Sequence, residues 1–452
     1  MRQFNGKQGL RRSQFAKAIR GTDLEKVLIV PIDVSKVLQK AMILNYFGET
    51  IEPAFSFMVS QTGMNVLTDH IEKAKSSLQT DKVFIGIEAT GHYYEDIVRI
   101  LMSQGYSVHI INPASTHEER KQHLTYTKTD NIDLYLIAEA LIGNKATDSK
   151  LNTGIYKQLQ HITRARRSEV EKRSRIKVEI RTYHDQIWRE YQGFSTLVKG
   201  KVKTKKIFSD FWGKASVHIL THYPHASQVL DLGELGLRRL SKEHNLKIRQ
   251  STIEKLLYAA SESVSKPLED LSSEIFLLKQ KLKDYEYHTR NIEMYEKEIE
   301  RLFIGTNGIL LLTIPGIGLI TAAETFCEMG DLSYFTNAGQ LIKKAGTNPV
   351  IKQSGPGNGY AGRISKQGNA NLRRAVYNAG KSLTVHNEVL KPFANRLKDK
   401  GKKAGAIYIA MGNKFLKVAF AMLTKGKPFK WDNPEYNYKE EVFKKLTLPL
   451  AA

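Results

Sequence analysis

The order of apolar runs between residues 26 and 142 constrains the fold of this 452-residue chain more than any other feature. Three runs of strand-like composition come first, at residues 26–32, 37–47 and 54–60. Helices and strands then alternate, as helix 64–78, strand 82–88, helix 93–104, strand 106–111 and helix 131–142. Consecutive strands followed by this alternation predict a mixed sheet in an α/β layer fold.

The rest of the chain is predicted to be mainly α-helical. Residues 156–192 form a basic segment with helical periodicity, whereas residues 200–250 show no clear pattern. From Leu268 to Leu302, apolar side chains recur at steps of three and four and fill 8 of 10 a and d positions of a heptad repeat. This repeat predicts either a coiled coil, which would also bring copies of the chain together, or a long core helix of a bundle.

The chain is strongly basic, and its charge is unevenly distributed. Lys and Arg number 69 against 46 Asp and Glu, which gives a formal net charge of +23. Residues 23–155 contain 17 acids and 12 bases, residues 156–206 contain 5 acids and 15 bases, and residues 340–430 contain two acids and 19 bases. Such an excess predicts a polyanionic partner, with nucleic acid favoured over an anionic membrane.

Composition excludes several classes of protein. Hydrophobic residues make up 41% of the chain, which is enough to build cores and excludes a wholly disordered protein. We find no apolar run of the roughly 18 residues that a membrane span needs, and residues 1–20 lack the apolar stretch of a signal peptide. The single cysteine, Cys327, excludes an intrachain disulfide and a cysteine-ligated zinc site. We therefore expect a cytoplasmic protein without a membrane partner.

Four carboxylates lie where predicted strands end or a helix begins. Asp33 ends the first strand, where Asp is an unusual residue, and Glu88 ends the fourth. Asp130 and Asp133 are three residues apart at the start of a helix, so both can project from one face. If the two strands are neighbours, these acids meet at one end of the sheet. Each acid taken alone is equally compatible with capping a turn or a helix.

A cluster of four carboxylates predicts a bound cation, because like charges raise one another's pKa unless a cation lies among them. Hard oxygen ligands of this kind suit Mg²⁺ or Mn²⁺. Two such ions about 4 Å apart activate a nucleophile and stabilise the leaving oxygen of a phosphodiester.

A glycine-rich segment near the C-terminus holds a candidate nucleophile, Ser354. Gly357, Gly359 and Gly362 of this segment match GxGxxG, but no strand precedes them in a βαβ unit, so we reject a dinucleotide site. A serine hydroxyl attacks phosphorus when its proton is removed and cations neutralise the phosphate. The following basic helix offers such cations at Lys366, Arg373 and Arg374.

Residues 312–323 are predicted to form a helix, a P-G-I-G turn and a second helix. The backbone N–H groups at such a helix N-terminus can hold a phosphate without reading sequence. An ordinary helix–helix turn explains the same residues equally well.

In this order and spacing, the motifs resemble the DEDD transposases of the insertion-sequence 110 family, which includes the Piv-type DNA invertases. The N-terminal part of the resemblance comprises I-D-V-S-K at Asp33, E-A-T-G-H-Y at Glu88, N-P, and K-T-D-x-x-D ending at Asp133. The C-terminal part comprises P-G-I-G-L-I-T-A-A, G-D-L-x-x-F, Q-S-G at Ser354, and G-R-I-S-K-Q-G-N-x-x-L-R-R. The resemblance covers most of the chain.

The resemblance implies an α/β RuvC-like (ribonuclease-H-like) domain, a long helical coiled-coil insert and a mainly α-helical transposase domain. The implied divisions are a basic leader (1–22), the RuvC-like DEDD domain (23–155), the helical linker and coiled coil (156–302), the transposase domain (303–430) and a tail (431–452).

The resemblance also implies the chemistry. Asp33, Glu88, Asp130 and Asp133 would be the Mg²⁺ or Mn²⁺ ligands, and Ser354 would join covalently to DNA. The implied activity is site-specific recombination of donor and target DNA, guided by a non-coding bridge RNA and performed by a homo-oligomer, a dimer that forms a tetramer in the synaptic complex. Family members often have a serine where this chain has Gln353, and Ser365 lies nearby as a second candidate.

Three alternative functions remain open from the sequence. A RuvC-like junction nuclease would use the same acids without a covalent step, and a Piv-type invertase has the same motifs as a transposase. A non-enzymatic nucleic-acid-binding scaffold would be expected to lack one or more of the four acids.

Overall fold

The computed structural model describes residues 19, 21–89, 91–113, 116–117, 129–143, 147–148, 153–198, 200–352, 360–431, 433 and 435–446. The chain divides into two compact units, Met1–Leu151 and Asn152–Ala452.

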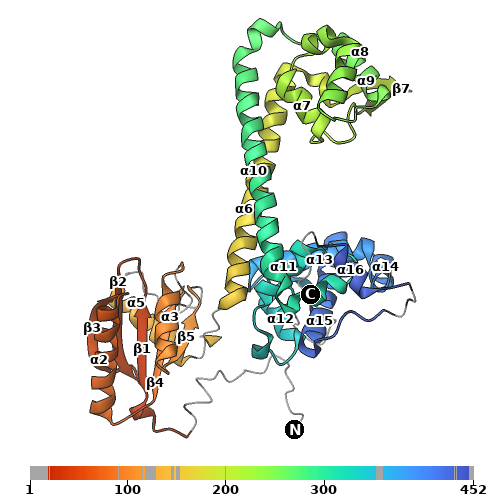
Figure 1. The fold of residues 1–452 in the computed structure, drawn as a ribbon. Coiled ribbons are helices and arrows are strands. Elements are labelled where there is room, and N and C mark those ends of the chain that lie inside the picture. The colour runs from red at the N-terminus through yellow and green to blue at the C-terminus, as the bar shows by residue number, and fades with distance from the viewer. Residues whose placement is uncertain are drawn as a thin grey trace. The chain divides into compact units, whose positions relative to one another are not determined.

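A six-stranded mixed sheet forms the centre of the first unit (Figure 1). Its strands are β1 (Leu28–Asp33), β2 (Leu38–Asn45), β3 (Thr50–Met58), β4 (Val83–Glu88), β5 (Ser107–Ile111) and β6 (Thr147–Asp148). They lie in the order β3-β2-β1-β4-β5-β6. β4 pairs in parallel with both β1 and β5, whereas the β1–β2, β2–β3 and β5–β6 pairs are antiparallel.

Helices cover both faces of this sheet because the strands are apolar on both faces. The helices are α2 (Gln61–Leu78), α3 (Tyr94–Ser103) and α5 (Asp130–Ile142). Leu28, Val30 and Ile32 share a core with α2 and α3, whereas Val27 and Ile29 share a second core with α5. Successive side chains of a strand point to opposite faces, so this alternation gives β1 its place in the middle of the unit.

The strands and helices predicted between residues 26 and 142 are all present, with ends that differ by a few residues. β6 was not predicted, because a two-residue strand has no periodicity to detect.

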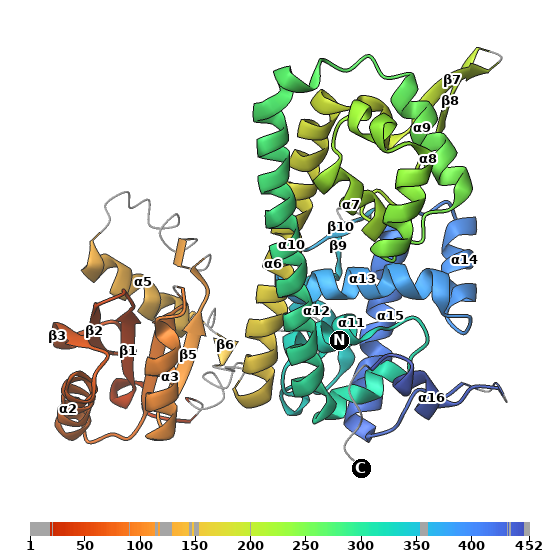
Figure 2. The ribbon, with the colours of Figure 1, turned by 45° about the horizontal axis from the view of Figure 1, so that its top comes forward.

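Two long helices, α6 (Gly154–Ile187) and α10 (Ser272–Ile304), pack side by side as the stem of the second unit (Figures 1 and 2). They are antiparallel, since Arg166 pairs with Glu296 while Glu179, further along α6, pairs with Lys281. Glu169 is buried between these pairs, and burial by itself would raise its pKa. Hydrogen bonds from Lys172, His288 and Asn291 have a larger opposite effect, so the pKa of Glu169 is lowered to about 2.

The heptad repeat of α10 finds its partner within the same chain. Leu278, Leu282, Ile292 and Ile299 are buried, and α6 is the helix against which α10 packs most extensively. As a coiled coil, this repeat was expected to bring copies of the chain together. Because α6 covers the apolar seam, a second copy of the chain would have to bind elsewhere on the stem.

Residues 188–271 form the tip subdomain, which lies at the far end of the stem from the C-terminal helices (Figure 1). Its elements are η2 (Arg189–Gln192), β7 (Phe194–Val198), β8 (Lys201–Lys205), α7 (Lys214–His222), α8 (Ala226–Glu243), α9 (Gln250–Ser261) and η3 (Leu268–Leu271). Trp188, Tyr191 and Leu256 form its core together with Ile180 of α6 and Leu282 of α10.

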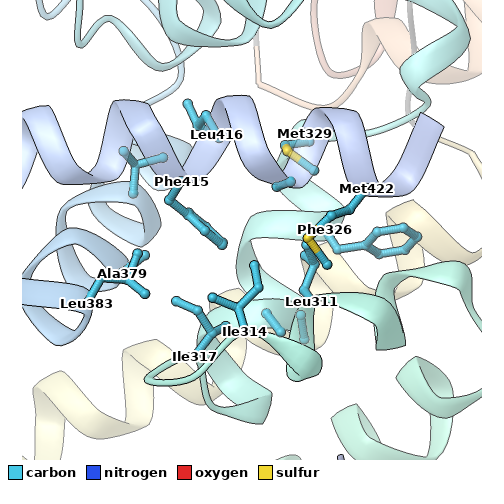
Figure 3. Packing of buried hydrophobic residues seen from close by; sticks show 14 of the residues in the cluster. Leu311, Ile314, Ile317, Phe326, Met329, Ala379, Leu383, Phe415, Leu416 and Met422 are labelled. Carbon is cyan, nitrogen blue, oxygen red and sulfur yellow. The ribbon is translucent and has the colours of Figure 1, made fainter. Parts of the chain in front are cut away.

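The C-terminal part of the second unit is mainly helical. Its elements are η4 (Asn307–Thr313), α11 (Leu319–Met329), η5 (Leu332–Tyr334), α12 (Ala338–Ala345), β9 (Pro349–Lys352), β10 (Tyr360–Ile364), α13 (Ala370–His386), α14 (Lys391–Asp399), α15 (Ala404–Lys425) and α16 (Tyr438–Phe443). Ile314, Phe326, Leu383 and Phe415 meet in its core (Figure 3).

One described helix, α15, is long and apolar enough to cross a membrane by length and composition alone. This corrects the expectation that no apolar run of that length exists. Met411, Phe415, Leu416 and Ala419 of α15 belong to the core of the second unit. The apolar character of α15 therefore has an explanation in packing against α13 and its neighbours.

The expected tail after residue 430 is partly built into this core. The Tyr436 hydroxyl donates to the carbonyl oxygen of Thr313, and Lys445 Nζ donates to the carbonyl oxygen of Leu312 at 2.7 Å. Val442 of α16 is buried.

Two facing glycines set the close approach of α13 and α15. A Cβ on Gly380 would overlap the carbonyl oxygen of Tyr408, and a Cβ on Gly412 would overlap that of Val376. We predict that Gly380→Ala lowers the free energy of unfolding by about 1–3 kcal/mol, since the helices must separate.

The matched control is Gly405→Ala in α15, where an added Cβ meets no heavy atom within 4 Å. Chemical denaturation of the full chain should show no loss of stability for this variant, because Ala favours helices over Gly by up to about 1 kcal/mol. Equal effects of the two substitutions would contradict the close helix contact.

Candidate active site

The parallel pairing of β1 and β4 brings the first two predicted carboxylates together. Ile32 is the partner of Ile87 in this ladder, so Asp33 and Glu88 end neighbouring strands at the same edge of the sheet. Neighbouring strands lie about 4.8 Å apart, so two acidic side chains at this edge are within strong electrostatic range.

The other two carboxylates come from the first turn of α5. Thr129 is the N-cap, and its side chain accepts a hydrogen bond from the backbone N–H of Ile132. Asp130 and Asp133 follow in the first turn, where the helix dipole favours negative charge. Asp130 contacts Lys40, which lies opposite Asp33 in the β1–β2 ladder, so the N-terminus of α5 lies at the edge where Asp33 and Glu88 end.

Asp33 lies in the field of all three other acids. Burial raises the pKa of Asp33, and the charges of Glu88, Asp133 and Asp130 raise it further. The structure therefore brings the four acids into one electrostatic cluster, which we call the carboxylate cluster.

Two side chains that the sequence analysis missed hold members of this cluster. Lys40 lies opposite Asp33 in the β1–β2 ladder, and its Nζ lies 2.6 Å from Asp130 Oδ2. Thr116 is buried, and its Oγ1 donates to Glu88 Oε1 at 2.6 Å. Strand register would have identified Lys40, but register is not visible in a single sequence. No sequence pattern identifies Thr116 as a partner of Glu88.

The donor set of the carboxylate cluster fits a hard divalent cation. Among the described residues, no three His, Cys, Asp or Glu side chains are already arranged to hold a metal ion directly. The four carboxylates nevertheless supply oxygen ligands whose mutual repulsion a cation would relieve. Lys40 already supplies one positive charge, at Asp130.

Ser354 lies outside the described residues, between the ends of β9 and β10. The second candidate serine, Ser365, is described, and its Oγ donates to Asn348 Oδ1 at 2.8 Å. In the P-G-I-G turn, Ser382 Oγ donates to the carbonyl oxygen of Gly316 and Asn387 Nδ2 donates to that of Pro315. This turn is therefore anchored to α13 and its C-cap, as an ordinary structural turn would be.

Two family models match the chain. The model of DEDD transposases of the IS110 type, described as "Transposase", matches residues 30–189, and the model described as "Transposase IS116/IS110/IS902 family" matches residues 309–395. Together they span more than half of the chain. The segment matched by the first model contains the four carboxylates, and the segment matched by the second contains Ser354. The chain belongs to the IS110 family of transposases.

Individual relatives agree with this family. The chain is 32% identical over 121 residues to the pilin gene-inverting protein of Moraxella bovis, which is 26% of this chain and 38% of that protein. It is 29% identical over 152 residues to the transposase for insertion sequence element IS1328 of Yersinia enterocolitica, 32% of this chain and 44% of the relative. An insertion element IS110 protein of Streptomyces coelicolor is 27% identical over 117 residues, 26% of this chain and 29% of that protein. The chain thus aligns with less than half the length of each relative.

Neutralising Asp33 should stabilise the metal-free chain. A raised pKa means that ionising Asp33 costs free energy in the fold, a cost absent below its unfolded pKa near 4 and complete once the pH exceeds the raised value. In EDTA at pH 7, Asp33→Asn should therefore raise the melting temperature by about 2–4 °C for each kcal/mol relieved, and should have no effect near pH 3.

The control is Asp69→Asn, which replaces an exposed acid of α2. Calorimetry of the full chain should show no change for this variant at either pH. A lower melting temperature for Asp33→Asn at pH 7 in EDTA would show that the four acids do not repel one another in the fold.

Removing Lys40 should have the opposite effect. Lys40→Met takes a positive charge from the carboxylate cluster, so we predict a lower melting temperature than wild type in EDTA and a larger gain on adding Mg²⁺. Lys36→Met, at an exposed position before β2, is the control and should behave like wild type in both buffers. If the two lysine variants respond alike to Mg²⁺, the contact of Lys40 with the cluster has no electrostatic role.

Proposed function

We propose that this chain is the DNA recombinase of an insertion sequence, an enzyme that cuts and rejoins DNA strands as a transposase. The observation that carries the proposal is the carboxylate cluster, formed at one sheet edge by residues far apart in the sequence, in a chain of the IS110 family. The first unit would be a RuvC-like domain. The sheet order β3-β2-β1-β4-β5 with an antiparallel β2 supports that assignment.

Asp33, Glu88, Asp130 and Asp133 would hold Mg²⁺ or Mn²⁺. Such ions activate an attacking hydroxyl and stabilise the leaving oxygen of a phosphodiester. Thr116 orients Glu88 by its hydrogen bond, and Lys40 holds Asp130. Both contacts fix carboxylates that must keep a defined geometry around a reacting phosphate.

The covalent step would belong to Ser354. Its Oγ forms a bond to phosphorus, the bond from phosphorus to the leaving sugar oxygen breaks, and the serine proton ends on that oxygen. Rejoining reverses these changes with a different DNA end, so no external energy source is needed. The position of Ser354 in a segment flanked by Lys352, Arg363 and Lys366 supports this role, because these cations can neutralise the phosphate.

The proposed partners are donor DNA, target DNA and a bridge RNA, in a dimer that forms a tetramer when two DNA duplexes are held together. The net charge of +23 supports polyanionic partners. The proposed domain divisions are the ones given by the resemblance, and the proposed location is the cytoplasm, at the nucleoid.

The second candidate function is that of a DNA invertase, which would use the same chemistry. The similarity to the pilin gene-inverting protein favours it. The flanking DNA distinguishes the two, because a transposase gene lies within the ends of a mobile element whereas an invertase gene lies beside the segment that it inverts.

The decisive test is to trap the covalent intermediate on a suicide DNA substrate and map the DNA-linked peptide by mass spectrometry. RNA that copurifies with the wild-type chain is sequenced first and added back. We predict an adduct on Ser354 that requires Mg²⁺ or Mn²⁺ and is lost, by at least 100-fold, in Ser354→Ala and Glu88→Gln.

Ser365→Ala is the matched control, because Ser365 already has a hydrogen-bond partner in Asn348. It should retain the adduct. Attachment of DNA at Ser365 or at a tyrosine would exclude Ser354 as the nucleophile. Full activity in EDTA would contradict a metal-dependent mechanism.

A further inference from the structure

The tip subdomain contains a pocket between the N-terminal ends of two helices. It lies outside both segments that match the family models. Its lining includes five basic residues and one acidic residue, which are Lys206, Lys214, Lys247, Arg249, Lys255 and Asp210. We call it the tip pocket.

Among the described residues, the basic side chains that line the tip pocket outnumber the acidic ones by five to one. Within the described part of the chain, none of the five forms an ion pair with a carboxylate. Asp210 Oδ1 accepts a hydrogen bond from the backbone N–H of Trp212. Elsewhere in the subdomain a basic residue does find an acid, since Arg238 pairs with Glu234 at 2.8 Å. Lys214 Nζ donates to the carbonyl oxygen of His244 at 3.2 Å, a contact that leaves its positive charge unbalanced. Like charges gathered without a carboxylate partner repel one another, so an anion bound there would be stabilised.

The helices that border the pocket add backbone donors. α7 begins after Gly213 and α9 begins after Arg249, and neither helix has a side-chain cap at its N-terminus. By contrast, His225 caps α8 with a complete capping box. The first amides of a helix lack intrahelical partners and carry partial positive charge, which suits phosphate oxygens.

We propose that the tip pocket binds the phosphodiester backbone of a nucleic acid. Five basic residues exceed what one phosphate needs, and four of them are exposed, so they can meet successive phosphates of a strand that passes over the pocket. Lys205, also exposed at the end of β8, extends the basic surface beyond Lys206. Contacts to phosphates position a nucleic acid without reading its sequence.

The proposal extends the proposed function and uses from it only that the chain works on nucleic acid. It assigns to the tip subdomain a role in holding the polymer, separate from the chemistry at the carboxylate cluster. Binding is measured without any reaction, so a failure of the recombinase assignment leaves this test intact.

The test compares two matched double variants of the full chain, each replacing one Lys and one Arg by Gln. Lys247→Gln with Arg249→Gln removes two cations of the pocket, whereas Arg239→Gln with Lys242→Gln removes two exposed cations of α8 in the same subdomain. Fluorescence anisotropy would follow binding to a 20-base-pair RNA duplex and to a DNA duplex of equal sequence across a range of NaCl concentrations.

Each phosphate contact contributes about 0.9 to the slope of log K against log salt, so the pocket variant should lose about 1.8 from the slope on the polymer that it binds. The α8 variant should keep the wild-type slope, and circular dichroism should show both variants folded. A loss on one duplex only identifies that polymer as the ligand. Equal slopes for the two variants on both duplexes would overturn the proposal. Binding of inorganic phosphate is measured as well. A pocket variant that binds phosphate more weakly but binds both duplexes like wild type would also overturn the proposal.

Discussion

The parallel pairing of β1 with β4 is the interaction on which the proposed active site depends. It aligns the ends of two strands that lie more than fifty residues apart in the chain, so Asp33 and Glu88 meet at one sheet edge. The antiparallel β2 then places Lys40 opposite Asp33, and α5, packed on β1, contributes Asp130 and Asp133. A one-residue slip in the β1–β4 register would turn one of these acids to the other face of the sheet.

Electrostatic imbalance is the common property of the two candidate sites. The carboxylate cluster has an excess of negative charge, which raises the pKa of Asp33. The tip pocket has five basic residues and one acid. In each site, repulsion between like charges lowers the stability of the chain without ligands. Each site is also complementary to one component of a metal-dependent reaction on nucleic acid: the carboxylate cluster to the cation, and the tip pocket to the phosphate.

Much of the fold was predictable from the sequence, because strands and helices that cover a core repeat their apolar residues with a fixed period. The alternation at Leu28, Val30 and Ile32 is one example. The heptad repeat of α10 predicted a long packed helix, but a repeat specifies a face and not its partner, so α6 was not identified. In the tip subdomain the elements are short and mixed, and no period marks the residues that line its pocket.

The four acids were predictable as candidates because acids are unusual at strand ends, whereas Lys40 and Thr116 became visible only through strand register and tertiary packing. Diffraction from crystals grown with Mn²⁺ tests the central claim most directly, since the anomalous signal locates the ion. We predict anomalous peaks within about 2.3 Å of carboxylate oxygens of Asp33, Glu88, Asp130 and Asp133. Well-ordered crystals soaked in millimolar Mn²⁺ that show no peak among these four side chains would contradict the account.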